Sequence, residues 1–113
     1  MTLSTHVLDT SLGKPAASVP VRVEVRDEAT AVWRALIDGL TDQDGRMKVL
    51  TSDFVWRAGV YRIRFDTEAY FTRVGTLGFY PEVTVVFEIR NPTQHYHVPL
   101  LLSPYGYSTY RGS

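Results

Sequence analysis

The sequence contains no cysteine, no excess of either charge and no long hydrophobic run. Without cysteine, disulfide bonds, thiolate nucleophiles and cysteine-ligated zinc are all excluded. The 12 Lys and Arg residues balance 12 Asp and Glu residues, so no clustered basic surface is expected for nucleic acid. The first residues, Met1 to Ser4, lack the basic and apolar regions of a signal peptide. We therefore expect a cytoplasmic protein with neither nucleic acid nor membrane as a partner.

Two common catalytic signatures are also absent. The sequence has no Gly-x-Ser-x-Gly nucleophile motif and no Gly-x-x-x-x-Gly-Lys-Ser phosphate loop. Its 113 residues predict a single domain, 1–113, which buries roughly two-thirds of its unfolded surface. A chain of this size forms a solid core but leaves little room for a deep pocket of its own. Any small-molecule site is therefore expected at an edge, at a mouth or between subunits.

What the sequence does have is an alternation of apolar and polar residues with a period of two. Val21, Val23 and Val25, for example, alternate with charged residues. β-branched and aromatic residues dominate these segments, which favours strands over amphipathic helices. Seven or eight short strands separated by turns indicate an all-β sandwich or barrel. The expected strands are 3–9, 21–26, 31–40, 61–66, 83–90, 96–102 and 106–110.

One segment departs from this alternation. Residues 67–75 combine helix-compatible side chains with a possible N-cap in Asp66 or Thr67 and a glycine, Gly75, at the end. They predict a short helix of about two turns. Turn-forming residues occupy 42–45 and 91–94, and residues 103–105 are a candidate tight hairpin.

The only histidines are His6, His95 and His97, and histidine is the usual general base near neutral pH. His6 is expected on the face of the first strand opposite Leu3, Thr5 and Val7, where an ordinary strand histidine is the simpler interpretation. His95 and His97 share one face of a strand because they are two residues apart, with His95 closer to solvent. Three histidines could hold catalytic zinc, but their spacing argues only weakly for it, and we predict no metal.

Arg46 and the last four residues are further candidates. Arg46 follows a turn, where a solvated arginine is the common case, but its guanidinium could also hold a planar, oxygen-rich ligand. Chain ends usually fray. The segment 105–110, however, has the pattern of a strand that runs almost to the end. It could bring an aromatic ring, a cation and a hydroxyl group to a site.

Four stretches together resemble one family, the 5-hydroxyisourate hydrolases, which are the enzymatic relatives of transthyretin. The resemblance covers nearly the whole chain. Its most specific part is the Tyr-Arg-Gly-Ser sequence at 110–113, which the hormone carrier transthyretin lacks. The stretches are Leu-Ser-Thr-His-Val-Leu-Asp with Gly-Lys-Pro-Ala (3–9 and 13–16), Thr-Asp-Gln-Asp-Gly-Arg (41–46), Phe-Tyr-Pro-Glu-Val leading into His-Tyr-His-Val-Pro-Leu-Leu-Leu-Ser-Pro (79–83 and 95–104), and Tyr-Gly-Tyr-Ser-Thr-Tyr-Arg-Gly-Ser (105–113).

The resemblance implies a two-sheet, transthyretin-like sandwich of about eight strands with one short helix. It implies a homotetramer, built as a dimer of dimers, with ligand sites in the channel between dimers, and no cofactor. The family's active-site positions correspond to four catalytic residues and three substrate-binding residues in this sequence. These are His6, Arg46, His97 and Ser113, and Tyr110, Arg111 and Gly112, respectively.

The implied reaction is hydrolysis of 5-hydroxyisourate, the product of urate oxidation, to 2-oxo-4-hydroxy-4-carboxy-5-ureidoimidazoline. Either His97 or His6 would deprotonate water, Arg46 would hold substrate oxygens, and Ser113 would contact the substrate or a histidine. Tyr110 and Arg111 would wall the channel. The alternatives are a non-catalytic carrier of a small aromatic ligand, a structural sandwich module and a zinc hydrolase using the same histidines.

Overall fold

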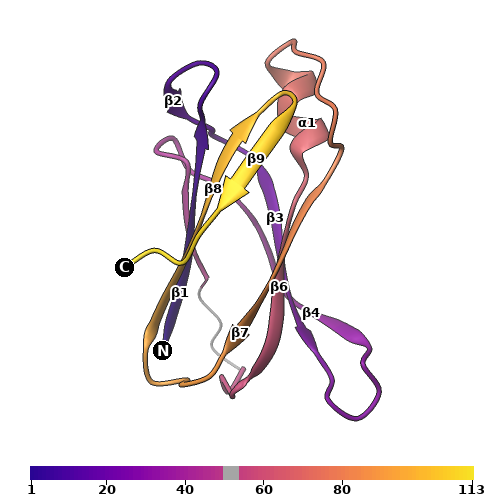
Figure 1. Ribbon diagram of the computed structural model, residues 1–113, viewed down its shortest axis with the longest axis vertical. Helices are drawn as coiled ribbons and strands as arrows, with labels where there is room; N and C mark the ends of the chain where they lie inside the picture. Colours follow the sequence, from indigo (N-terminus) through magenta and orange to yellow (C-terminus); the bar gives the residue numbers. More distant parts are fainter. Residues whose placement is uncertain (50–53) are drawn as a thin grey trace.

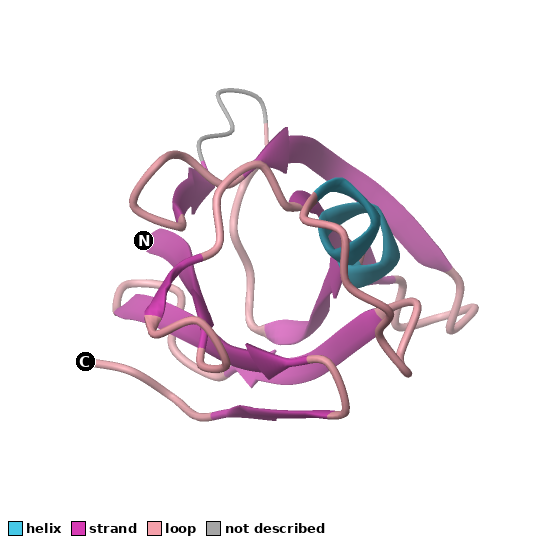
Figure 2. Ribbon diagram, turned by 90° about the horizontal axis from the view of Figure 1, so that it is seen from above, coloured by secondary structure: helices cyan, strands magenta, loops and turns pink. Residues whose placement is uncertain are grey.

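The computed structural model describes residues 1–49 and 54–113, which form two β-sheets packed face to face with one short helix at one end (Figures 1 and 2). One sheet has the order β2–β1–β8–β9, and β5 pairs with β1 beside β2; the other has the order β4–β3–β6–β7. The strands of the first sheet are β1 (Thr2–Asp9), β2 (Lys14–Pro15), β5 (Arg46–Val49), β8 (His95–Ser103) and β9 (Gly106–Thr109). Those of the second are β3 (Pro20–Arg26), β4 (Trp33–Leu40), β6 (Gly59–Phe65) and β7 (Val83–Ile89).

The predicted sandwich is confirmed, and the seven strands expected from the sequence are all present. The described residues add two that were not expected, β2 and β5. Both are too short for a two-residue alternation to stand out. The strand expected over 31–40 begins two residues later, because Ala31 takes a left-handed backbone conformation, with φ of 59°, in the preceding turn.

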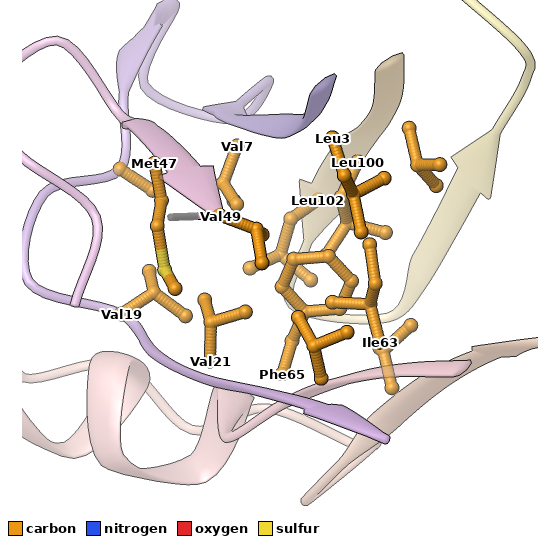
Figure 3. Close-up of a cluster of buried hydrophobic side chains, with 14 of the residues drawn as sticks. Leu3, Val7, Val19, Val21, Met47, Val49, Ile63, Phe65, Leu100 and Leu102 are labelled. Atoms are coloured by element: carbon orange, nitrogen blue, oxygen red, sulfur yellow. The ribbon is translucent and has the colours of Figure 1, made fainter. Parts of the chain in front are cut away.

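The core lies between the sheets and is built from alternate residues of each strand (Figure 3). In β1, for example, Leu3 and Val7 are fully buried while Ser4 and His6 are half-buried on the other face. Each fully buried aliphatic side chain contributes about 1.5–3 kcal/mol to folding. The alternation therefore fixes which residues of β1 face away from the core, and His6 is among them, as predicted.

The helix α1 (Thr67–Arg73) closes one end of the sandwich and confirms the predicted helix. Asp66 caps it by accepting a hydrogen bond from the Ala69 backbone amide, and Gly75 follows it with φ of +75°. The hydroxyl of its buried Tyr70 donates to Asp9 at the end of β1, at 2.7 Å. No helix in the described residues is long and apolar enough to cross a membrane.

Candidate active site

Strand β1 brings the predicted site residues together because it lies between β5 and β8. On its antiparallel side, His6 lies directly opposite Arg46. On its parallel side, Ser4 lies directly opposite His97. Side chains at such positions have Cβ atoms about 5 Å apart. Since Ser4 and His6 share one face of β1, three segments far apart in the sequence place His6, His97 and Arg46 on one outer face.

The turn before β5 positions Arg46. Gly45 has φ of +74°, and a Cβ atom there would lie 2.3 Å from the Val7 carbonyl oxygen, so the close approach to β1 requires glycine. The Val7 amide donates to the Gly45 carbonyl at 2.7 Å. The Asp42 carboxylate accepts from the Arg46 amide at 2.9 Å. Arg46 is thus the first residue of a strand held to β1, and its exposed side chain starts from a fixed backbone.

His97 is the half-buried centre of this group. Its Nδ1 atom lies 2.8 Å from the Ser4 hydroxyl oxygen. Burial lowers the pKa of His97, and the nearby charges of His6, His95 and Arg46 lower it further, against an opposing hydrogen bond from the Ser4 backbone. The imidazole is therefore neutral at pH 7, which is the state that can accept a proton.

The residues after β9 lead to the C-terminus (Figure 1), and Gly112 forms an isolated antiparallel bridge with His97 of β8. The Gly112 amide donates to the His97 carbonyl oxygen at 2.8 Å. A Cβ atom on Gly112 would lie 2.5 Å from Cδ2 of the His97 ring, closer than real side chains approach. Position 112 therefore has to be glycine for the imidazole to keep its place, and exposed Ser113 follows directly.

Tyr110 and Arg111 belong to the same segment and were predicted to bind substrate, but they line a hollow that does not include His97. This mostly apolar hollow of about 240 Å³ is also lined by Phe87 and Tyr96. The Arg111 guanidinium lies 4.5 Å from the Tyr96 ring centroid and donates to the Gln94 side-chain oxygen at 3.2 Å. Among the hydrogen bonds of the described residues, none joins Tyr110 or Arg111 to the side chains of His6, Arg46 or His97.

His95 lies on the same face as His97, as its spacing predicted. The two rings are nearly parallel with centroids 6.4 Å apart, and His95 is the more exposed of the pair. Its Nδ1 atom contacts the Thr2 hydroxyl across the β1–β8 pairing. No group of three or more His, Asp or Glu side chains in residues 1–49 and 54–113 is arranged to hold a metal ion.

The sequence reasoning missed the hydroxyl groups that accompany these histidines. Ser4 lies two residues before His6, so the alternation in β1 already placed it on the same face. Its contact with His97 depends on the parallel pairing of β1 with β8, which joins residues 93 positions apart. Nothing in the local sequence could reveal that register.

In the part of the chain that the structure describes, no salt bridge involves His6, Arg46 or His97. An imidazole that is neutral and a guanidinium on the same face suit hydrolysis, because the imidazole can accept a proton from water while the guanidinium stabilises negative charge on an oxygen. Arg46 and Ser113 are exposed, so the site is open on a single chain.

The sequence and the fold are similar to those of known proteins. Residues 3–112 match the model of the HIUase/Transthyretin family. The chain is 49% identical over 111 residues to a 5-hydroxyisourate hydrolase of Salmonella typhimurium, covering 98% of this chain and 80% of that protein.

Two solved structures are similar over nearly the whole chain. A 5-hydroxyisourate hydrolase of Klebsiella pneumoniae is 36% identical, with a TM-score of 0.83 and full coverage of both chains. Sea bream transthyretin in complex with thyroxine is also 36% identical, with a TM-score of 0.89, and the match covers 97% of this chain and 93% of that one. The fold is therefore shared by an enzyme and a hormone-binding protein.

Proposed function

The chain belongs to the HIUase/Transthyretin family, and we propose that it is an enzyme that hydrolyses 5-hydroxyisourate in urate catabolism. The observation that carries this proposal is that His97, a half-buried imidazole whose pKa is lowered, shares a face with His6 and with Arg46, which forms no salt bridge to any described residue. These groups suit a small, planar, oxygen-rich substrate better than a hydrophobic one.

In the proposed reaction, water attacks a carbonyl carbon of the six-membered ring. A histidine accepts a proton from the water as the new C–O bond forms. The ring C–N bond then breaks and the carbonyl carbon becomes a carboxylate. The released nitrogen takes a proton and becomes the terminal NH2 of the ureido group. The product is 2-oxo-4-hydroxy-4-carboxy-5-ureidoimidazoline, and no cofactor takes part.

We assign the role of base to His97. Its lowered pKa keeps it neutral at pH 7, and the Ser4 hydroxyl engages Nδ1, which leaves Nε2 available. Arg46 holds substrate oxygens and stabilises the developing oxyanion, and His6, opposite Arg46, orients or shuttles the proton. Gly112 keeps the His97 ring in place, and Ser113 contacts the substrate. Tyr110 and Arg111 line a separate hollow of the single chain, and their proposed role is to wall the channel between chains.

We further propose that the protein is a homotetramer, a dimer of dimers in which a second chain covers this face. The openness of the site supports this, since Arg46 and Ser113 are exposed on one chain and catalysis gains from the exclusion of water. Light scattering during size-exclusion chromatography should give a mass four times the 12.8 kDa of the chain. A stable, active monomer would contradict the tetramer.

The activity is tested by following the ultraviolet absorbance of freshly made 5-hydroxyisourate with and without the protein, before and after exhaustive chelation of metal ions. We expect decay much faster than the spontaneous reaction, and equally fast after chelation. A decay rate that does not change when the protein is added would overturn the proposal. Tight binding of thyroxine without turnover would instead favour a carrier, and activity lost on chelation would favour a zinc hydrolase.

A further inference from the structure

Two hydroxyl groups of β1 contact two imidazoles of β8 at alternate positions of the parallel pairing, on the same face. Thr2 lies opposite His95 and its hydroxyl contacts His95 Nδ1. Ser4 lies opposite His97, with its hydroxyl oxygen 2.8 Å from His97 Nδ1. The outer pair is exposed, whereas the inner pair is partly buried and belongs to the candidate active site.

The His97 ring is held from both sides. Nδ1 and Cδ2 are the two ring atoms bonded to Cγ, so they lie on opposite edges of the imidazole. Ser4 contacts the Nδ1 edge, and Gly112 packs against the Cδ2 edge so closely that a Cβ atom would lie 2.5 Å away. A ring held in this way has only Cε1 and Nε2 at its free end, and Nε2 is the only atom there that can accept a proton.

The protein groups around Nδ1 favour a proton on that atom. A serine hydroxyl can accept or donate a hydrogen bond, so its position alone does not fix the tautomer. The Ser4 backbone raises the pKa of His97 against the larger effect of burial, as an acceptor near a ring N–H does. The ring atom that the Ser4 hydroxyl contacts is Nδ1, so the Ser4 side favours a proton there.

We propose that Ser4 is a positioning residue that holds His97 in the tautomer with the proton on Nδ1, leaving Nε2 unprotonated and directed to the substrate. The catalytic meaning of this tautomer rests on the proposed hydrolase function, but the tautomer itself does not. In this arrangement Nδ1 donates to the Ser4 oxygen, and Nε2 takes the proton of the attacking water.

The matched control is Thr2. Thr2→Ala removes the same kind of hydroxyl–imidazole contact two residues earlier on both strands. The imidazole there is that of His95, which takes no part in the proposed reaction. If these contacts only join the two strands, Ser4→Ala and Thr2→Ala should have similar effects. If Ser4 positions His97, only Ser4→Ala should alter the catalytic histidine.

The experiment combines nitrogen-15 NMR of the histidine side chains with turnover of 5-hydroxyisourate by the wild type, Ser4→Ala, Ser4→Thr and Thr2→Ala. In the wild type we expect His97 to carry its proton on Nδ1. Ser4→Ala should give a mixture of tautomers and lower kcat about tenfold, with KM changed less than twofold, because only part of the enzyme then presents a free Nε2. Ser4→Thr should restore the Nδ1-protonated tautomer and the kcat of the wild type. Thr2→Ala should change only the His95 signals.

A wild-type His97 with its proton on Nε2 would overturn the proposal without any variant being needed. So would a Ser4→Ala protein that keeps the tautomer and kcat of the wild type, or a Thr2→Ala protein with an equal loss of kcat. If the wild type fails to hydrolyse 5-hydroxyisourate, the proposed function is wrong, but the NMR measurement still decides whether Ser4 sets the tautomer.

Discussion

The outer faces of the two sheets both carry positive side chains, but within residues 1–49 and 54–113 the salt bridges lie on only one of the two sheets. On the β4–β3–β6–β7 sheet, three arginines have a carboxylate partner: Arg22 with Asp38 at 2.7 Å, Arg62 with Glu24 at 2.6 Å and Arg64 with Glu82 at 2.7 Å. On the β5–β1–β8 face, no salt bridge of the described residues involves His6, Arg46 or His97.

This difference separates a face that holds the fold together from one that is prepared for a ligand. One carboxylate of the paired face, that of Glu24, is almost fully buried and forms a salt bridge with Arg62. The Arg62 guanidinium also stacks 4.2 Å from the centroid of the Trp33 ring. On the other face, burial lowers the pKa of His97, and nearby positive charges lower it further. Groups whose pKa is shifted in this way are characteristic of functional sites.

The largest effect is expected from His97→Asn, which removes the proposed base but keeps a side chain of similar polarity. We expect kcat to fall by at least about 100-fold, while the circular dichroism spectrum and the oligomeric mass stay those of the wild type. Initial rates of 5-hydroxyisourate decay provide the measurement. Turnover within a few-fold of the wild type would remove His97 from the mechanism and shift the role of base to His6.

The second largest loss of activity is expected from removing the Arg46 guanidinium. Arg46→Ala should lower kcat/KM by roughly 100-fold, since it deletes a donor to the substrate and its oxyanion. The matched control is Arg22→Ala on the paired face, which breaks an exposed salt bridge and should leave kcat/KM unchanged, with little change in stability because exposed salt bridges contribute little. Equal kinetic losses in the two variants would show that the two faces do not differ in function.

A smaller loss is expected from Gly112→Ala, because the new methyl group must push the His97 ring aside. We expect kcat to fall about tenfold, as a displaced base loses its alignment with water. Gly106→Ala in β9 is the control, since its Cβ atom would meet only the Ser103 hydroxyl at 3.7 Å. The two variants should have similar melting temperatures. An active Gly112→Ala protein would mean that the imidazole tolerates displacement.

The smallest effect on activity is expected from Glu24→Gln, which instead tests the paired face. This change leaves Arg62 without its buried carboxylate and should cost about 1–3 kcal/mol of stability. Urea unfolding measures that loss, and kcat of the folded protein should match that of the wild type. Reduced kcat without reduced stability would indicate that this face also contributes to catalysis.

The sequence alone predicted the sandwich and the helix because both depend on local patterns. Alternating residues defined the strands, and Asp66 with Gly75 marked the ends of the helix. It did not predict β5, so Arg46 was expected at the end of a turn rather than in a strand paired with β1. Four residues hold too little alternation to be recognised without the partner strand.

The candidate site could be named from the resemblance but not assembled from the sequence. Which residues meet depends on the registers of β1 with β5 and β8, and these are set by packing across the whole sandwich. The Ser4 contact with His97 follows only from the parallel register. The need for glycine at position 112 follows only from the return of the chain along β8.

The most direct test of the central claim, that a neutral His97 is the base, is the dependence of kcat/KM on pH for the wild type. Burial and the charges of His6, His95 and Arg46 lower the pKa of His97 below its usual value of 6.5, so the rate should be level near pH 7. As the pH falls through the lowered pKa, the imidazole gains a proton and kcat/KM should drop about tenfold per pH unit. A rate that stays constant down to pH 4.5, or that falls only as the pH rises above 7, would contradict the account.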